Sequence, residues 1–239
     1  MSTELLYLSD MQQLECKAFI EKIENRDGKT VVYLDQTVFY PQGGGQPYDK
    51  GVINTPDSEL QVEEVRYVDG LVQHIGTLSG QPLMQGEDVS CAVDAERRVI
   101  NTAYHSGGHV IDMAIDALGY SWMPTKGHHY PGEAYIEYLG ELSDEDIASL
   151  GDKLTAKLTE LTTSNIATEL RFVPVEKMDE LCRHVPSNIP KDKPGRVVMY
   201  GDFGVPCGGT HTASLNELEG IKIRKIKSQN GKIKISYEV

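Results

Sequence analysis

The stretch Asp94–Gly119, DAERRVINTAYHSGGHVIDMAIDALG, divides the chain into two different sequence patterns. It contains no proline, Asp94 suits a helix N-cap, and Gly119 suits the stop that ends a helix. The stretch therefore predicts one long helix. Its weak point is the pair Gly107-Gly108, because each glycine inside a helix costs about 1 kcal/mol relative to alanine.

The residues before this helix carry a strand pattern. Short apolar segments rich in β-branched residues alternate with turn signals such as Asp69-Gly70. Their spacing predicts a small β-barrel-like domain over residues 1–93. The run Met11 to Ile23 fits either a short helix or a strand.

The residues after this helix mix both patterns. A second helix is expected to begin after Ser143. Its apolar residues recur at spacings of three and four: Ile147, Leu150, Leu154, Leu158 and Leu161. Strand candidates lie at 166–173 and 196–200, and a hairpin surrounds Asn230-Gly231. The predicted fold class is α+β, in which the small barrel precedes a two-layer α/β domain with an antiparallel sheet over residues 94–239.

The charge of the chain is −13 over 239 residues, which argues against nucleic-acid binding through overall basicity. Residues 221–239 nevertheless carry +5, which leaves −18 on the rest. Lys222, Arg224 and Lys225 in this segment fit either a phosphate-contacting strip or a solvated edge hairpin. Four scattered cysteines favour a reducing cytosol, and neither a signal peptide nor a membrane-spanning run is expected. A monomer is favoured.

Two pairs of potential metal ligands stand out. His105 and His109 are four residues apart, so a helix places both on one face. Cys207 and His211 flank the glycine-rich sequence Gly-Gly-Thr, which can fold both side chains toward one point. Three imidazoles and one thiolate suit tetrahedral zinc, so we expect one Zn²⁺ per chain. The helical pair lacks the glutamate of His-Glu-x-x-His peptidases.

A second conspicuous segment is FYPQGGGQPYDKG at residues 39–51. Its backbone N–H groups at Gly43, Gly44 and Gly45, with Gln46 beside them, could cradle a carboxylate, a carbonyl or a phosphate. A flexible hairpin tip is the alternative interpretation. No Gly-Lys-Ser/Thr follows, so the segment is not a P-loop.

Together these motifs resemble the editing domain of alanyl-tRNA synthetase. The similarity is greater to its free-standing relatives, the AlaX-type trans-editing proteins, and the length and glycine-rich loop match the medium-length form. The resemblance runs from about Glu24 to Val239. Two departures concern the first metal pair. Asn101-Thr102-Ala103 stands where the family usually has His-Thr-Ala, and Ser106-Gly107-Gly108 separates the two histidines.

The resemblance implies an ATP-independent aminoacyl-tRNA hydrolase. Its substrate would be the acylated acceptor end of tRNA(Ala), chiefly seryl-tRNA(Ala), with glycyl-tRNA(Ala) as a second candidate. It implies a serine-recognising role for Thr125. Zinc would either activate a water or hold the substrate's amino group, while Gln46 and the Gly43–Gly45 amides polarise the ester carbonyl. The candidate RNA contacts outside the hairpin are Arg97, Arg98 and His128.

Two other functional classes remain open on the sequence. A non-catalytic, zinc-stabilised tRNA-binding module would bind both zinc and tRNA without hydrolysing the ester. A zinc amidohydrolase would act on small molecules in the absence of tRNA. Ester hydrolysis on tRNA separates the editing hypothesis from both.

Overall fold

The computed structural model describes residues 2–239, and the chain divides into two compact units. The first comprises residues up to Gly43 together with Pro47–Ile100, and the second comprises Gly44–Gln46 together with Asn101–Val239. The division falls within the long helix α1 (Ala95–Ala117). The boundary between residues 93 and 94 stays a prediction.

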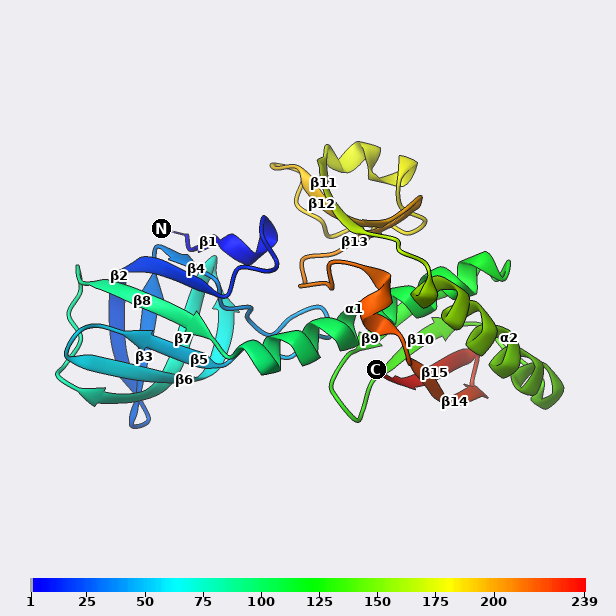
Figure 1. Ribbon diagram of the computed structural model, residues 1–239. Coiled ribbons are helices and arrows are strands. Elements are labelled where there is room, and N and C mark those ends of the chain that lie inside the picture. Colours follow the sequence, from blue (N-terminus) through cyan, green and yellow to red (C-terminus); the bar gives the residue numbers. More distant parts are fainter. Residues whose placement is uncertain (1) are drawn as a thin grey trace. The chain divides into compact units, whose positions relative to one another are not determined.

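The first unit contains a closed barrel of antiparallel strands (Figure 1). Around the barrel the order is β2-β3-β7-β6-β5-β8. Their bounds are β2 Glu15–Arg26, β3 Lys29–Leu34, β5 Gly51–Asn54, β6 Ser58–Val68, β7 Leu71–Gly80 and β8 Asp88–Val93. A short parallel pair, β1 (Glu4–Leu5) with β4 (Gln36–Thr37), accompanies the 3₁₀ turn η1 (Leu6–Leu8). The predicted barrel is confirmed, and the run Met11–Ile23 contributes to strand β2.

Alternation of apolar and polar residues builds this barrel. In β8, Val89, Cys91 and Val93 are buried while Asp88 and Ser90 are exposed. Asp69-Gly70 forms the predicted tight turn between β6 and β7, with positive φ at both residues. Every second side chain along such a strand therefore points into the barrel interior.

The first unit contains a buried ion pair. The guanidinium of Arg98 binds the carboxylate of Asp49, with Nη2 to Oδ2 at 2.5 Å, and the two side chains are 3% and 0% exposed. Arg98 also donates to the carbonyl of Val38 at 2.6 Å. This corrects the expectation that Arg98 contacts RNA, because its guanidinium N–H groups bind acceptors inside the protein. Neighbouring Arg97 donates to the carbonyl of Tyr48 and lies over the Tyr48 ring.

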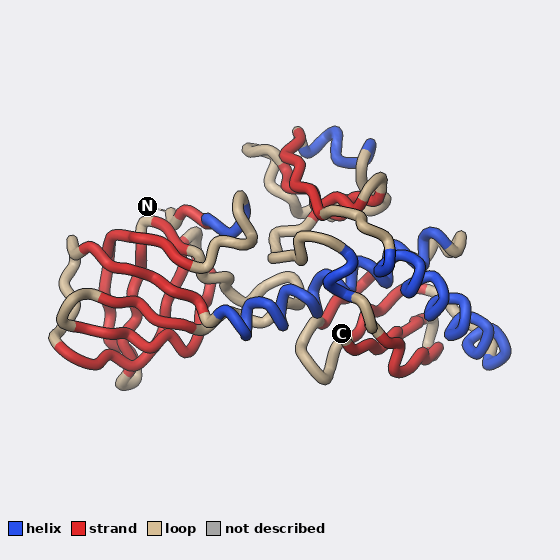
Figure 2. Tube along the Cα trace, in the orientation of Figure 1, coloured by secondary structure: helices blue, strands red, loops and turns tan. Residues whose placement is uncertain are grey.

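The second unit contains a four-stranded antiparallel sheet of order β14-β15-β10-β9. Its strands are β9 (Met123–His128), β10 (Tyr135–Leu139), β14 (Lys222–Gln229) and β15 (Lys232–Glu238). Side chains from α1 and from α2 (Asp144–Thr163) share one hydrophobic core with β10 and β15. Figure 2 shows these helices in blue beside the red strands of the same unit.

A second, smaller sheet in this unit has the order β11-β12-β13. It is formed by β11 (Thr168–Val173), β12 (Gly195–Tyr200) and β13 (Phe203–Pro206). The 3₁₀ turns η2 (Val175–Glu180) and η3 (Leu215–Leu218) complete the secondary structure. The mixed α and β content with antiparallel sheets agrees with the predicted class, whereas the single predicted sheet is in fact two.

Helix α1 has the predicted ends. The Asp94 carboxylate accepts a hydrogen bond from the backbone N–H of Arg97 at 3.0 Å, and Gly119 adopts a φ of +83° just after the last turn. The glycine pair inside the helix has a packing reason. A methyl group at Gly107 would lie 2.8 Å from the Val239 side chain, and one at Gly108 would overlap the imidazole of His129.

Helix α2 also follows its sequence pattern. The Ser143 hydroxyl caps it by accepting from the backbone N–H of Asp146 at 3.2 Å. The leucines at the predicted spacing are buried: Leu150, Leu154, Leu158 and Leu161. Over residues 2–239, no helix combines the length and apolar character needed to span a membrane.

Candidate metal centre

The two halves of the predicted metal motif meet in the second unit. His105, His109, Cys207 and His211 each offer one ligand atom, and these atoms all lie within 4.8 Å of one another. The three imidazole rings are mutually close, with centroids 4.6–5.0 Å apart. Helix α1 presents the first pair from successive turns, and the loop after β13 presents the second.

The glycines of this loop give the cluster its compactness. Cys207 Sγ lies 3.4 Å from His105 Nε2 and accepts a hydrogen bond from the N–H of Gly209. A methyl group at Gly209 would overlap the His105 ring. Glycine at this position therefore lets the cysteine loop lie directly against α1.

The donor set fits a divalent metal ion of intermediate softness. His109 Nε2 is buried and has no hydrogen-bond partner, which is costly for a polar atom unless it is a ligand. Burial lowers the pKa of His109 to about 4 and holds those of His105 and His211 well below the usual range. The imidazoles are thus neutral at pH 7, as metal coordination requires. Three nitrogens and a sulfur match zinc chemistry.

Gln46 fixes the tautomer of His105. Its Oε1 lies 2.6 Å from His105 Nδ1 and accepts from the N–H of Thr210, while its Nε2 donates to the Thr210 hydroxyl. Because Oε1 can only accept, His105 Nδ1 carries the hydrogen. The lone pair of Nε2 then faces Cys207, which is the arrangement of a metal-binding histidine held by an outer partner.

Tyr200 and Arg196 support the other half of the cluster. The Tyr200 hydroxyl lies 3.0 Å from His211 Nδ1, so we assign Nε2 to the metal cluster. Arg196 Nη1 donates to the carbonyls of Cys207 and Gly209 at 2.6 and 3.1 Å. Sequence reasoning missed both residues. The available signal was the charged Arg196 within the otherwise apolar sequence of β12.

His129, rather than His128, reaches the metal cluster. The His129 ring stacks on that of His105 with centroids 4.7 Å apart, and its Nδ1 lies 2.6 Å from the Tyr237 hydroxyl. Burial lowers the pKa of His129 to about 3. His128 instead stacks on Tyr130. Its location is compatible with the expected RNA contact but does not test it.

The glycine-rich loop brings Gln46 into the second unit. The Gly45 carbonyl accepts from the N–H of His129, and a methyl group at Gly45 would overlap the backbone of Gly127. Gly44 and Gly45 both adopt positive φ. This loop is therefore held against β9 rather than forming an unattached hairpin tip. The Gly43 carbonyl, in the first unit, accepts from Tyr40.

Thr125 lies away from the cluster. It is exposed on β9, and its hydroxyl donates to the Glu137 carboxylate at 2.9 Å and to the Glu137 carbonyl at 3.2 Å. The alternation of β10 buries Ile136 and Tyr138 and turns Glu137 to the opposite face of the sheet. Thr125 falls at the register shift of the β9–β10 pairing, between the pairs Lys126–Glu137 and Pro124–Tyr138, and it is not among the residues of the metal cluster.

The basic residues of the C-terminal hairpin separate into two groups. Arg224 donates to the carbonyls of Gly132 and Ala134, so it ties β14 to a neighbouring loop. Lys222 and Lys225 are exposed on β14, which is an edge strand. Their contact with phosphate remains a prediction, and Lys222 and Lys225 are better suited to it than Arg224.

Comparison with known proteins places this chain in a family. Over 233 residues the chain is 30% identical to alanyl-tRNA editing protein AlaX-M of Methanosarcina barkeri, covering 95% of this chain and 94% of that protein. The chain belongs to the alanyl-tRNA editing proteins. It is also 34% identical over 235 residues to alanyl-tRNA editing protein AlaX-L of Pyrococcus horikoshii.

The chain spans only part of the length of several of its relatives. The match covers 95% of the chain and 56% of AlaX-L. An alanine–tRNA ligase of Methanopyrus kandleri is 31% identical over 230 residues, covering 92% of this chain and 24% of the ligase. The family model described as tRNA synthetases class II (A) matches residues 6–97.

Substituting Gln46 tests whether this residue supports the metal centre. Gln46→Leu removes the acceptor for His105 Nδ1 and leaves the N–H of Thr210 unpaired. We expect metal affinity to fall about 10–100-fold, as for other partners that orient a ligand. Competition with a chelator of known affinity measures the change. Gln42→Leu, in the same loop, is the matched control and should leave the affinity unaltered.

Proposed function

We propose that the protein is a zinc-dependent hydrolase that removes the wrong amino acid from tRNA(Ala). Its main substrate would be seryl-tRNA(Ala), with glycyl-tRNA(Ala) as the second. The observation that carries this proposal is the cluster of three histidines and Cys207 in a chain that belongs to the alanyl-tRNA editing proteins. One zinc ion per chain is the ion that fits these donors.

The chemistry of amino acid selection supports a separate hydrolytic site. A pocket that accepts alanine cannot strongly reject glycine, which lacks one methyl group, or serine, which adds a hydroxyl. The difference is worth only a few kcal/mol. A second site that hydrolyses the wrong ester supplies the missing selectivity. The substrate would be bound through the acceptor end of the tRNA, in the reducing cytosol, where the four free thiols of the chain would persist.

Gln46 acts on His105 rather than on the ester. Its Oε1 faces His105 Nδ1 and the N–H of Thr210, and its Nε2 donates one hydrogen bond to the Thr210 hydroxyl. We therefore assign Gln46 a positioning role instead of the predicted catalytic one. The N–H groups of Gly44 and Gly45 remain the proposed donors for the ester carbonyl. We do not assign serine recognition to Thr125, whose hydroxyl is engaged with Glu137.

Bound zinc would supply Lewis acidity, which polarises either the attacking water or the substrate. The surrounding residues keep His105 in one tautomer and hold the cysteine loop in place. Burial of the His105 and His211 rings strengthens electrostatic interactions at the site. We propose that Lys222 and Lys225 contact the tRNA backbone, so binding should weaken as salt is raised.

A deacylation assay tests the proposed function directly. The protein is incubated with seryl-, glycyl- and alanyl-tRNA(Ala), with and without a chelator, and the loss of ester is followed. We expect rapid loss of the seryl ester, slower loss of the glycyl ester, little loss of the alanyl ester, and protection of all three by the chelator. If the seryl and glycyl esters decay only at the uncatalysed rate, the protein is a binding module instead.

A further inference from the structure

Two of the four cysteines lie opposite each other in the barrel. Strands β2 and β8 pair in the antiparallel direction, and Cys16 is the partner of Cys91 in this pairing. Directly opposed residues of an antiparallel pair place their side chains on the same face of the sheet. Cys91 is 2% exposed in the barrel core, and the half-buried Cys16 packs against the same core. The two thiols are therefore neighbours at the barrel wall.

The spacing of this pair permits a covalent link. The backbone N–H of Val93 donates to the Leu14 carbonyl at 2.9 Å, two positions along the same pairing. Hydrogen-bonded pairs recur at every second residue of an antiparallel pairing, so Cys16 and Cys91 form such a pair, with Cα atoms about 5.5 Å apart. Disulfides span Cα separations of about 4.4–6.8 Å. The two sulfur atoms are thus within reach of one bond.

The two thiols differ in their acidity. A hydrogen bond with the Cys91 thiol lowers the pKa of Cys16, and a backbone group of Val38 adds to this effect. The same hydrogen bond and burial raise the pKa of Cys91. The thiolate is the reactive form of a cysteine, so the half-buried Cys16 is the thiol that meets an external reagent. Cys91 is then placed to react with the product, as a resolving cysteine does.

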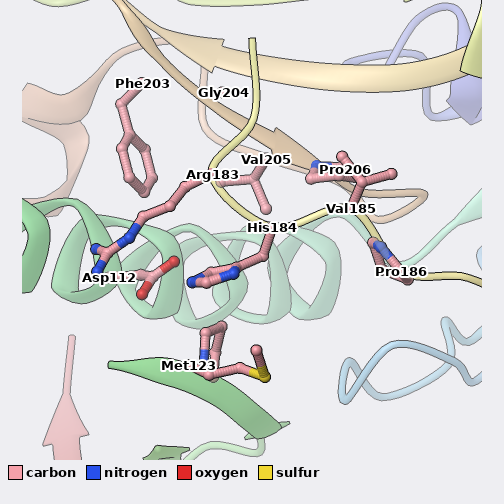
Figure 3. Close-up of a pocket in the computed structure, with 11 residues that line it drawn as sticks. Asp112, Met123, Arg183, His184, Val185, Pro186, Phe203, Gly204, Val205 and Pro206 are labelled. Atoms are coloured by element: carbon pink, nitrogen blue, oxygen red, sulfur yellow. The ribbon is translucent and has the colours of Figure 1, made fainter. Parts of the chain in front are cut away.

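The other two cysteines have different surroundings. Cys207 belongs to the metal cluster. Cys182 lies in the second unit, where it precedes Arg183 and pairs with Gly204, two of the residues that line the pocket in Figure 3. Burial raises the pKa of the Cys182 thiol to about 11. Cys182 is therefore a comparison thiol of low reactivity within the same chain.

We propose that Cys16 and Cys91 form a reversible disulfide when the protein meets hydrogen peroxide. The Cys16 thiolate attacks one peroxide oxygen, so that an S–O bond forms and the O–O bond breaks. The departing hydroxide takes up the proton that Cys16 gave up and becomes water. Cys91 then attacks the sulfur of the sulfenic acid; the S–S bond forms, the S–O bond breaks, and the Cys91 proton leaves with the oxygen as a second water. The two thiols lose two electrons, and the peroxide gains them.

The geometry favours a bond that is easily reduced. Opposed residues in a sheet have Cβ atoms about 4.5–5.5 Å apart, whereas the Cβ atoms of a relaxed disulfide are about 3.8 Å apart. Drawing β2 and β8 together stores strain, and a strained disulfide is readily reduced by another thiol. The bond would also enclose β3, β5, β6 and β7 in one covalent loop, which restricts the unfolded barrel.

Peroxide treatment of the zinc-loaded full chain tests the proposal. The remaining thiols are alkylated under denaturing conditions, the protein is digested, and the peptides are analysed by mass spectrometry with and without dithiothreitol. We expect the loss of two alkylatable thiols per chain and a linked pair of peptides that contain Cys16 and Cys91. The melting temperature should rise on oxidation, because the unfolded chain is cross-linked. Dithiothreitol should reverse all three changes.

Variants separate the two thiols. Cys16→Ser removes the half-buried thiol and should abolish both the link and the rise in melting temperature. Cys91→Ser should instead leave Cys16 as a sulfenic acid that dimedone traps, because the resolving thiol is missing. Cys182→Ser is the matched control and should keep the link between Cys16 and Cys91.

This inference does not depend on the proposed function, because neither cysteine belongs to the metal cluster. Oxidation of Cys182 or Cys207 while Cys16 and Cys91 stay alkylatable would overturn it. So would a loss of two thiols that persists in Cys16→Ser, or a link that dithiothreitol does not reverse. An unchanged melting temperature in the fully linked protein would overturn the stabilising effect of the bond. Deacylation of seryl-tRNA(Ala) by the reduced protein tests the proposed function separately.

Discussion

His105→Ala is expected to lose both the bound zinc and the deacylation of seryl-tRNA(Ala). The substitution removes one of four ligands and also the partner of Gln46. Partners that only orient a ligand cost 10–100-fold in metal affinity when they are removed. Removal of a ligand itself should therefore lower the metal affinity by more than about 100-fold. Metal analysis of the purified protein and initial rates of ester loss measure the two effects.

The loss of zinc should also lower the melting temperature. An ion that binds only the folded state stabilises that state by mass action, so a protein without zinc lacks this stabilisation. His128→Ala is the matched control, since His128 stacks on Tyr130 outside the cluster. It should keep its zinc and its stability. A His105→Ala protein that retains a full zinc content would exclude our ligand assignment, and one that lacks zinc but retains the parental rate would exclude a catalytic role for the metal.

Arg98→Met is expected to destabilise the protein by about 3–5 kcal/mol, because it leaves the buried carboxylate of Asp49 without its partner. Amide hydrogen exchange of the barrel strands reports this loss locally. The double variant Asp49→Asn/Arg98→Met should recover part of it, since the uncompensated charge is gone.

Arg97→Ala is the control for the ion pair. Arg97 makes one hydrogen bond to a backbone carbonyl and one contact with the Tyr48 ring, so its removal should cost much less. A phosphate-contacting role for Arg98 predicts the opposite result, namely unchanged stability with weaker tRNA binding. Equal protection of the barrel amides in Arg98→Met and the parental protein would therefore refute the structural role.

The metal ligands could be predicted because their signal is local in the sequence. His105 and His109 lie four residues apart in a proline-free helical stretch, and Cys207 and His211 flank glycines. The structure brings these four residues together. The ends of α1 and the leucine spacing of α2 are equally local, since caps and periodicity depend on neighbours only a few residues away.

The supporting residues were harder to predict because their partners are distant in the chain. The sequence makes Arg98 a candidate RNA contact, since nothing near it in the chain indicates its buried partner Asp49. The resemblance implies a serine-recognising role for Thr125, but the position of this residue depends on the register of β9 against β10. Arg196 and Tyr200 appeared as ordinary strand residues. The reason for Gly107 and Gly108 also became clear only from Val239 and His129.

The hydrogen bonds around Gln46 constrain the order in which the protein can assemble. Gln46 and Thr210 are separated by 164 positions, and His105 and Cys207 by 102. Closing such long loops carries an entropic cost that must be met before the contacts form. We therefore expect the metal centre to be completed late in folding, once the segments around Gln46, His105 and Cys207 have come together. A fragment that begins after Gln46 would keep all four ligands and still lack the carbonyl that sets the proton of His105.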